Sequence, residues 1–273
     1  MLSCPSAGIC GGCQIHLASY EEHLAEKERN LRKILRDADL EKHSGSISPC
    51  PDRLHYRNKM EYSFGNEAIG ASLELGLHAK GRYMSVVYAG ACLIAPEDFN
   101  KIVNAVRDFT REKAYDFYHR KRHEGLLRHL ILRRGVRTGE ILVNIVTTGG
   151  SFDEDGFLKV VLGAETEDRI CGVLRTIDES VSDAIKPESV KILYGVPYYM
   201  EHLMGLDFKV GPFSFFQTNV PAAERLYTDA IGLIEGLEGK IVYDLYCGTG
   251  TITQALATKA SKVYGVEIVE ESV

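Results

Sequence analysis

The stretch "VYDLYCGTGTITQAL" (Val242–Leu256) constrains the fold more than any other part of the chain. A strand-like segment runs into Gly248 and Gly250 and then into a helix-like segment, and a second strand-like segment, "SKVYGVEIV", follows. A strand–helix–strand unit with a glycine turn is typical of a doubly wound parallel sheet. Glycines also let a ligand approach the backbone closely. The unit therefore predicts a nucleotide-type binding site.

The residues around this turn favour S-adenosylmethionine as the ligand. The dinucleotide fingerprint needs a third Gly or Ala where this chain has Thr253, which weighs against NAD. Asp244 precedes the glycines, where a carboxylate suits a ligand with a cationic end. Glu267 ends the next strand, where a carboxylate can accept hydrogen bonds from both ribose hydroxyls. The alternative is a purely structural turn, which glycine-rich motifs also form.

Three cysteines gather near the N-terminus in "CPSAGICGGCQIHL". Cys4, Cys10 and Cys13 lie closer together than average cysteine usage would place them. In a reducing compartment, clustered cysteines are more often metal ligands than disulfide partners. A four-thiolate site needs one more ligand, for which Cys50 and Cys92 are candidates. Zinc and iron–sulfur clusters both accept four thiolates. The alternative is a set of free thiols.

Composition predicts an ordinary soluble protein of one to two domains. The chain has 273 residues, of which 45% are hydrophobic and 26% charged. It contains no run of about 18 apolar residues that would span a membrane. The N-terminus has neither the basic start nor the apolar core of a signal peptide. We therefore expect a cytoplasmic protein.

Pattern and periodicity divide the chain into three parts, and the predicted fold class is α/β. Residues 1–45 hold the cysteine segment and an amphipathic helix that should pack on a core. Residues 46–208 combine several strand candidates with one helix, "APEDFNKIVNAVRDFTREK", in a mixed α/β domain. Residues 209–273 hold the start of a Rossmann-like domain. The apolar residues of the first helix are Leu17, Tyr20, Leu24, Leu31 and Leu35.

Two stretches suggest contact with RNA, although the net charge is −6. "HRKRHEGLLRHLILRRGVR" carries seven Lys or Arg residues and one acid, and "LHYRNKMEY" interleaves aromatic and basic residues. A local basic surface can bind phosphates whatever the total charge. RNA loops are held by phosphate contacts and by stacking. The alternative is a set of solvated strand faces. The candidate RNA contacts are Arg57, Lys59, Arg128, Arg133 and Arg134.

Six motifs, taken in order, resemble the RNA uracil-C5 methyltransferase family. This family makes 5-methyluridine in 23S ribosomal RNA and in tRNA. The resemblance runs from Cys4 to Val273. The motifs are the cysteine segment, "YRNKMEYSFG", "LRHLILRRG", "GPFSFFQTN", "DLYCGTGT" and "GVEIVEESV".

The resemblance implies two cofactors. The first is a 4Fe–4S cluster held by Cys4, Cys10 and Cys13, with Cys92 and not Cys50 as the fourth ligand. This cluster would make residues 1–45 an iron–sulfur segment whose last ligand comes from the central domain. The second is S-adenosylmethionine at the glycine turn. Its implied contacts are Gln217, Tyr246, Thr251 and Glu267, beside Asp244, Gly248 and Gly250.

The implied reaction is methylation of a uridine through a covalent cysteine adduct. A thiolate adds to C6 of uracil, C5 takes the methyl group, and a carboxylate removes the C5 proton so that the thiolate leaves. The base must first be flipped out of its stack. In the family, the nucleophilic cysteine and the glutamate that removes the C5 proton lie downstream of the strand–helix–strand unit. This chain ends before both, so we expect a C-terminally truncated, inactive form that acts as a monomer.

Two other functions fit parts of the sequence. A non-catalytic RNA-binding iron–sulfur protein would need only the cysteines and the basic strands. A redox enzyme would use the cluster for its chemistry, although no substrate pocket is evident beside the cysteines. Continuation of the reading frame into a later cysteine would favour the methyltransferase over the first alternative.

Overall fold

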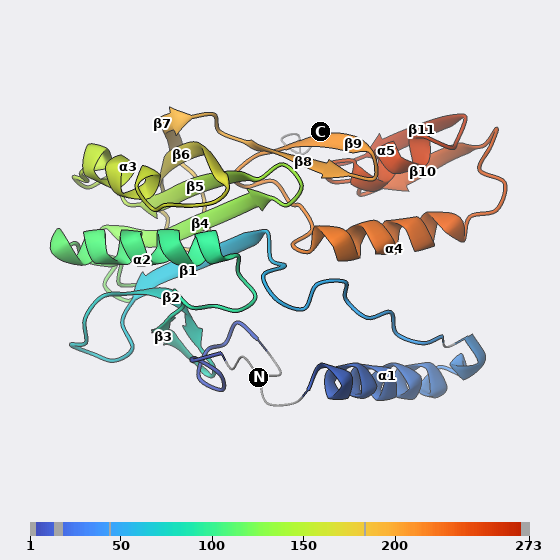
Figure 1. The fold of residues 1–273 in the computed structure, drawn as a ribbon, viewed down its shortest axis with the longest axis horizontal. Coiled ribbons are helices and arrows are strands. Elements are labelled where there is room, and N and C mark those ends of the chain that lie inside the picture. Colours follow the sequence, from blue (N-terminus) through green and yellow to red (C-terminus); the bar gives the residue numbers. More distant parts are fainter. Residues whose placement is uncertain (1–3, 14–18, 44, 183, 269–273) are drawn as a thin grey trace.

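A seven-stranded mixed sheet forms the body of the protein in the computed structural model, which describes residues 4–13, 19–43, 45–182 and 184–268 (Figure 1). The strand order is β3-β2-β1-β4-β5-β6-β7. All neighbours are antiparallel except β5 and β6, which are parallel. The strands are β1 Lys59–Gly65, β2 Glu74–Ala79, β3 Arg82–Tyr88, β4 Leu127–Gly135, β5 Glu140–Thr147, β6 Arg169–Ile177 and β7 Ser189–Gly195.

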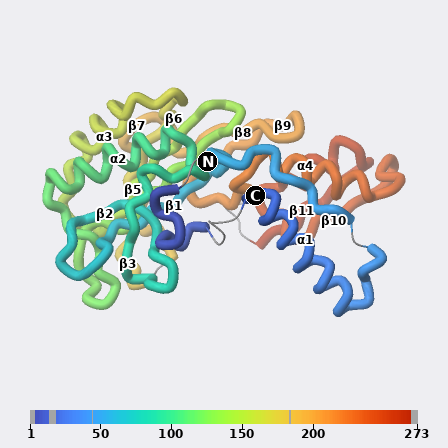
Figure 2. Tube along the Cα trace, turned by 60° about the horizontal axis from the view of Figure 1, so that its bottom comes forward, coloured from blue at the N-terminus to red at the C-terminus, as the bar shows by residue number. Residues whose placement is uncertain are grey.

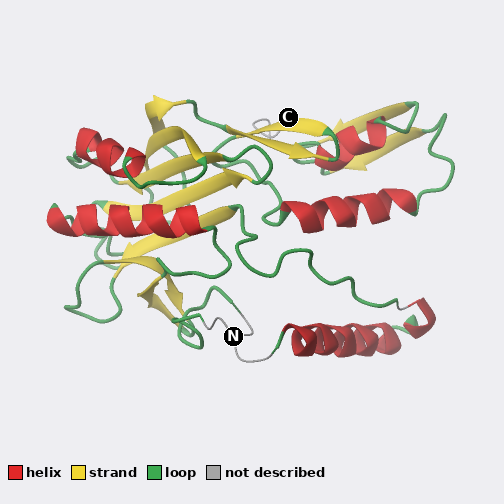
Figure 3. Ribbon diagram, in the orientation of Figure 1, coloured by secondary structure: helices red, strands yellow, loops and turns green. Residues whose placement is uncertain are grey.

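Two helices cover one face of this sheet (Figure 3). α2 (Glu97–Glu112) is the helix predicted from the sequence. α3 (Glu154–Leu162) was not predicted, because acids outnumber its apolar residues at the N-terminal end. Its start is fixed by Asp153, whose side chain accepts a hydrogen bond from the amide of Gly156 at 2.9 Å. α3 supplies the crossover that the parallel pair β5–β6 requires.

The other face is covered in part by a hairpin and a helix. β8 (Tyr199–Leu203) and β9 (Leu206–Val210) pair antiparallel and pack with α4 (Val220–Gly232) in a second apolar cluster. Met204 and Gly205 have positive φ and turn the chain back between the two strands. The predicted boundary at residue 208 falls inside β9.

The strand–helix–strand unit predicted around the glycine turn is present. β10 (Ile241–Leu245) pairs in parallel with β11 (Lys262–Val266), and α5 (Thr251–Ala257) connects them. Register places Asp244 opposite Gly265. Together with the mixed sheet, this unit confirms the predicted α/β fold class.

The N-terminal helix forms as predicted, but its packing was predicted wrongly. α1 (Tyr20–Asp37) begins at a capping box between Ser19 and Glu22 and is followed by the 3-10 turn η1 (Glu41–His43). None of its residues is buried, and the helix lies away from the central sheet in both views (Figure 2). Its contacts with the loop before β1 include a stack of Arg53 on Tyr20, 4.1 Å from the ring centroid, an ion pair of Arg53 with Glu21 at 3.0 Å, and a hydrogen bond from the amide of Cys50 to the hydroxyl of Tyr20 at 2.6 Å.

Within the described ranges, no helix combines the length and the apolar character needed to cross a membrane.

Candidate functional site

The glycine turn bends through residues with left-handed backbone. Gly248 and Gly250 have φ of 55° and 71°, which glycine adopts without steric cost. Tyr246 has φ of 65°, which is uncommon for a residue with a Cβ. The amides of Tyr246 and Cys247 both donate to the carbonyl of Val266, at 2.8 and 3.1 Å. Backbone outliers of this kind cluster at ligand sites.

Two carboxylates bracket the turn, as predicted for Asp244 and Glu267. One oxygen of Glu267 accepts a hydrogen bond from the amide of Gly248 at 2.8 Å. Asp244 accepts one from the hydroxyl of Thr253 at 2.5 Å, which gives the third position of the motif a role that neither Gly nor Ala could fill. An ionised carboxylate has about four lone-pair sites. Asp244 therefore keeps capacity to accept hydrogen bonds from a ligand.

The structure brings Gln217 and Thr251 together. Both line a small cavity of about 10 Å³ with Phe215, Phe216 and Thr249. The segment before α4 thus lies against the glycine turn, although more than 30 residues separate them in the sequence. The side chain of Tyr246 is 89% exposed and does not line this cavity.

The same segment closes a larger cavity toward the central sheet. This cation–phenylalanine cavity has a volume of about 310 Å³, at the lower end of ligand pockets. Phe215 is 68% exposed, and both Phe215 and Phe216 line the small cavity as well. The sequence prediction missed these phenylalanines, although their run before Gln217 was the signal. The lining residues are Arg57, Lys59, Glu61, Arg133, Phe213, Ser214, Phe215, Phe216 and Thr218.

The cations of this cavity are only partly compensated, although Lys59 lies 3.8 Å from a carboxylate oxygen of Glu61. Burial, and then repulsion from Arg133, lowers the pKa of Lys59. Burial also lowers the pKa of Arg133, which donates to the carbonyl of Ser214 at 2.6 Å but leaves Nε and Nη1 without partners. Among the described residues Arg133 forms no ion pair. Leaving a buried charge unpaired is costly, so a polar or anionic ligand would stabilise it.

The predicted RNA contacts differ in whether their side chains are already buried or bound to other groups of the protein. Arg57 and Lys59 line the cation–phenylalanine cavity. Arg134 is paired with Asp168. The side chain of Arg128 is only 3% exposed. Neither Arg128 nor Arg134 presents an uncommitted guanidinium at the surface, and their contact with RNA stays a prediction. The carbonyls that Arg128 binds are those of Asp178, Ser180 and Ser182.

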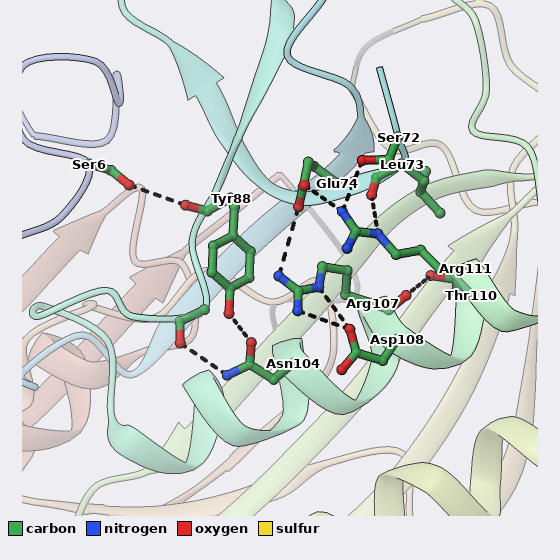
Figure 4. Close-up of polar contacts among 11 residues, drawn as sticks. Ser6, Ser72, Leu73, Glu74, Tyr88, Asn104, Arg107, Asp108, Thr110 and Arg111 are labelled. Carbon is green, nitrogen blue, oxygen red and sulfur yellow. Dashed lines mark hydrogen bonds and ion pairs between the residues drawn. The ribbon is translucent and has the colours of Figure 1, made fainter. Parts of the chain in front are cut away.

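The cysteine loop docks on the edge of the central sheet. The amide of Gly11 donates to the carbonyl of His78 at 2.8 Å, and the amide of Lys80 donates to that of Ile9 at 2.7 Å. The hydroxyl of Ser6 donates to the carbonyl of Tyr88 at 3.3 Å, next to the polar network that joins β3 to α2 (Figure 4). This docking carries the N-terminal cysteines toward Cys92, which follows β3.

Two of the predicted ligand thiols, Cys10 and Cys13, are affected by the other two. Burial raises the pKa of both Cys10 and Cys13, and the nearby Cys92 and Cys4 raise it further in each case. Cys50 is engaged elsewhere, since its sulfur accepts a hydrogen bond from the amide of Asn219 at 3.1 Å. Across the described residues, no three His, Cys, Asp or Glu side chains are placed to hold a single metal ion.

Comparison with known proteins finds relatives that share one description, RNA methyltransferase. No protein-family model matches the chain. It is 41% identical to an uncharacterized RNA methyltransferase of Clostridium tetani and 39% identical to one of Clostridium acetobutylicum. Each match covers 99% of this chain and 60% of the relative. The chain therefore spans about 60% of the length of these curated relatives.

Among solved structures, the fold resembles that of the tRNA (uracil-54, C5)-methyltransferase of Pyrococcus abyssi, which was crystallised with S-adenosyl-L-homocysteine. The TM-score is 0.76 at 24% identity, and the match covers 99% of this chain and 61% of that one. At this identity the similarity establishes a shared fold.

Proposed function

Because this chain belongs to the same family as these RNA methyltransferases, we propose that it binds S-adenosylmethionine and a uridine of ribosomal RNA or tRNA for methyl transfer to C5 of the base. The observation that carries this proposal is the segment Phe213–Thr218. It lines both the small cavity at the glycine turn and the cation–phenylalanine cavity. Methyl transfer requires both reactants in one site, and a shared wall between two cavities supports that arrangement.

We assign the cofactor to the glycine turn. Bound S-adenosylmethionine would supply a methyl group carried on a positively charged sulfur. Asp244 suits its cationic end, and Glu267 suits the ribose hydroxyls. Gly248 and Gly250 allow close approach of the backbone. Gln217 and Thr251 face one cavity beside the turn, and the exposed ring of Tyr246 offers a surface against which the ligand can lie.

We assign the uridine to the cation–phenylalanine cavity. Exposed Phe215 offers a stacking surface for an unstacked base, and aromatic stacking contributes about 1–3 kcal/mol per base in single-stranded complexes. Arg57 and Lys59 supply positive charge for the adjoining phosphates. The unpartnered Nε and Nη1 of Arg133 are donors for a uracil carbonyl or a phosphate oxygen.

The proposed reaction passes through a thiolate adduct at C6 of uracil. The thiolate forms a bond to C6, C5 gains the methyl group, and loss of the C5 proton to a base restores the double bond and expels the thiolate. We assign this thiolate to neither Cys171 nor Cys247. Burial raises the pKa of Cys171 to about 11, which disfavours its thiolate. Cys247 packs against Gly265, where an added Cβ would lie 2.9 Å from its sulfur.

We also propose that Cys4, Cys10, Cys13 and Cys92 hold a 4Fe–4S cluster. Thiolates around such a cluster each bind a different iron, so they stand farther apart than the ligands of one ion. The effect of Cys92 and Cys4 on the pKa values of Cys10 and Cys13 supports this arrangement. The backbone of Cys92 is held by Asn100 through hydrogen bonds of 3.1 and 3.2 Å. A bound cluster would fasten the N-terminal loop to the central sheet.

Iron and sulfide analysis of anaerobically purified protein tests the ligand set. Cys92→Ser should lose most of the iron, whereas Cys50→Ser should retain it, because Cys92 and not Cys50 acts on the pKa values of Cys10 and Cys13. Loss of iron in the Cys50 variant alone would overturn the assignment.

Mass spectrometry of cellular RNA tests the methyltransferase activity. Deletion of the gene should abolish 5-methyluridine at one or more sites, and the wild-type gene should restore it. Asp244→Ala should fail to restore the modification because the cofactor site loses a carboxylate. Asp207→Ala, which removes an exposed carboxylate on β9, is the matched control and should restore it. If every 5-methyluridine survives deletion, uracil C5 is not the target.

A further inference from the structure

The wall that the central sheet gives to the cation–phenylalanine cavity carries a donor group and an acceptor group side by side. β1 and β4 pair antiparallel with Lys59 opposite Arg133, and Glu61 lies two residues further along β1. Residues two apart on a strand point to the same face of a sheet, and so do direct partners on neighbouring strands. Lys59, Glu61 and Arg133 therefore share one face, and all three line the cavity.

Burial places Arg133 at the floor of this cavity and Phe215 at its mouth. Arg133 is 1% exposed, whereas Phe215 is 68% exposed. The side chains of Lys59 and Glu61 lie between these limits, at 33% and 42% exposed. Nη2 of Arg133 donates to the carbonyl of Ser214 at 2.6 Å. This hydrogen bond fixes the guanidinium against the segment that carries Phe215.

Arg133 and Glu61 both keep hydrogen-bonding capacity for a ligand. In the described part of the chain, Nε and Nη1 of Arg133 have no partner at hydrogen-bonding geometry, although the phenol of Tyr199 lies close enough to act on the charge of the guanidinium. Glu61 forms an ion pair with Lys59 at 3.8 Å. An ionised carboxylate has about four lone-pair sites, so this long contact leaves Glu61 able to accept a hydrogen bond.

A base fits the floor of this cavity better than a phosphate does. The carboxylate of Glu61 lines the same cavity and repels an anion. The charge for backbone phosphates comes instead from Arg57 and Lys59, which are only half-buried. A flipped base is neutral, and it enters with its polar edge first and one face against Phe215.

Uracil and cytosine differ at the edge that reaches this floor. In uracil, O4 accepts a hydrogen bond and the N3–H group donates one, whereas in cytosine the 4-amino group donates and N3 accepts. A guanidinium only donates, and an ionised carboxylate only accepts. Arg133 and Glu61 therefore complement O4 and N3–H of uracil. Cytosine would set a donor against a donor and an acceptor against an acceptor.

We propose that Arg133 and Glu61 select uracil over cytosine, with Arg133 donating to O4 and Glu61 accepting a hydrogen bond from N3–H. Arg57 and Lys59 hold the backbone whatever the base, so these two pairs of residues have separate roles. This selection rests on the proposed function, which places the target base in the cation–phenylalanine cavity.

Fluorescence anisotropy with two short labelled RNAs tests this selection. Both RNAs have adenosines on each side of a central nucleotide, which is uridine in one and cytidine in the other. Wild type should bind the uridine RNA roughly tenfold more tightly, a difference of ~1.4 kcal/mol. Arg133→Gln should bring the two affinities within about twofold of each other, because an amide both donates and accepts. Equal affinity of wild type for the two RNAs, or an unchanged ratio in Arg133→Gln, would overturn the selection.

Arg57→Gln is the matched control, because it removes the same charge from another residue that lines the cavity. It should weaken binding of both RNAs and leave their ratio near that of wild type. The slope of log affinity against log salt should shrink by roughly 0.7 in Arg57→Gln, for one lost phosphate contact on a single strand. If Arg133→Gln instead weakens both RNAs equally and shrinks the slope in the same way, Arg133 binds a phosphate and the selection is wrong.

Glu61→Gln gives a second test that does not depend on a buried residue. Its amide can donate to N3 of cytosine, so the preference for uridine should fall to about threefold or less. Glu67→Gln changes an exposed acid that does not line the cavity, and it should keep the wild-type ratio. Should Arg133→Gln fold poorly, an unchanged ratio in Glu61→Gln is enough to overturn the selection.

Calorimetry with adenosylhomocysteine separates a failure of this selection from a failure of the proposed function. Cofactor binding should be the same in wild type and Glu61→Gln. Normal binding of cofactor and RNA, with no preference between the two bases, would contradict the selection alone. Absence of binding to adenosylhomocysteine and to both RNAs would contradict the proposed function, and the selection would fall with it.

Discussion

The two sheets that contain the candidate sites differ sharply in burial. In the central sheet, nearly every residue of β4 and β5 is buried, because helices, hairpin and loops cover both faces. In β10, the apolar residues Ile241, Tyr243 and Leu245 are 60%, 65% and 62% exposed. The described part of the chain therefore covers the centre of one sheet and leaves the other with uncovered apolar surface.

The central sheet is therefore a rigid platform. The β10–β11 unit at the glycine turn depends on contacts with a ligand for its stability. The cation–phenylalanine cavity uses β1 and β4 as its floor, so its cations are held by a packed core. The glycine turn is held mainly by the parallel pair β10–β11 and by hydrogen bonds to Val266 and Glu267. Elements with few buried apolar contacts open more readily. A ligand that binds the turn should consequently stabilise this region more than the central sheet.

The largest expected effect comes from the core under the central sheet. Phe157 of α3 is fully buried against Phe109 and Phe152, so Phe157→Ala should lower the free energy of unfolding by about 3–5 kcal/mol. Urea denaturation followed by circular dichroism measures this. A loss below about 1 kcal/mol would contradict the contrast between the two sheets, because the stability of the central sheet would then not depend on its core.

The second, smaller effect is a loss of stability at acidic pH. His129 has a pKa of about 4 in the folded protein, whereas an unfolded histidine titrates near ~6.5. The unfolded chain then binds this proton at higher pH, so stability should fall by up to about 3 kcal/mol between about pH 6.5 and 4. His129→Gln should remove that part of the pH dependence in urea titrations. An unchanged profile would show that His129 is not held neutral.

The smallest effect is expected in the two-stranded sheet. Tyr243 and Tyr264 stack with ring centroids 5.1 Å apart, but Tyr243 remains exposed. Tyr243→Ser should change the free energy of unfolding by no more than about 1.5 kcal/mol, the value of one aromatic pair. Comparison with Phe157→Ala in the same denaturant series sharpens the contrast. A larger loss from Tyr243→Ser than from Phe157→Ala would invert it.

Local patterns in the sequence were sufficient for most of the fold and for the glycine turn. Alternation marked the strands of the central sheet, and Gly248 and Gly250 marked the turn because positive φ there needs glycine. α3 escaped prediction since its first turn is acidic, although Asp153 is a favourable cap. The hairpin of β8 and β9 escaped because Met204, an unusual turn residue, has positive φ.

Features that depend on tertiary packing could not be predicted from local pattern. Basic residues in a strand look alike in sequence, but Arg128 is buried against carbonyls, Arg134 is paired, and Lys59 faces a cavity. The amphipathic pattern of α1 predicted burial that the structure does not show. A small cavity on the central sheet combines residues from β1, β2, β3 and β4 with a loop, so only the folded chain brings them together.

Hydrogen–deuterium exchange with adenosylhomocysteine and, separately, with an RNA hairpin tests the central claim most directly. The cofactor should slow exchange in residues 244–254 and in Phe213–Thr218. RNA should slow exchange in residues 57–61 and in the same Phe213–Thr218 segment. Protection of that segment by both ligands is the predicted result. Protection by one ligand alone, or by neither, would contradict a single segment that joins the cofactor to the uridine.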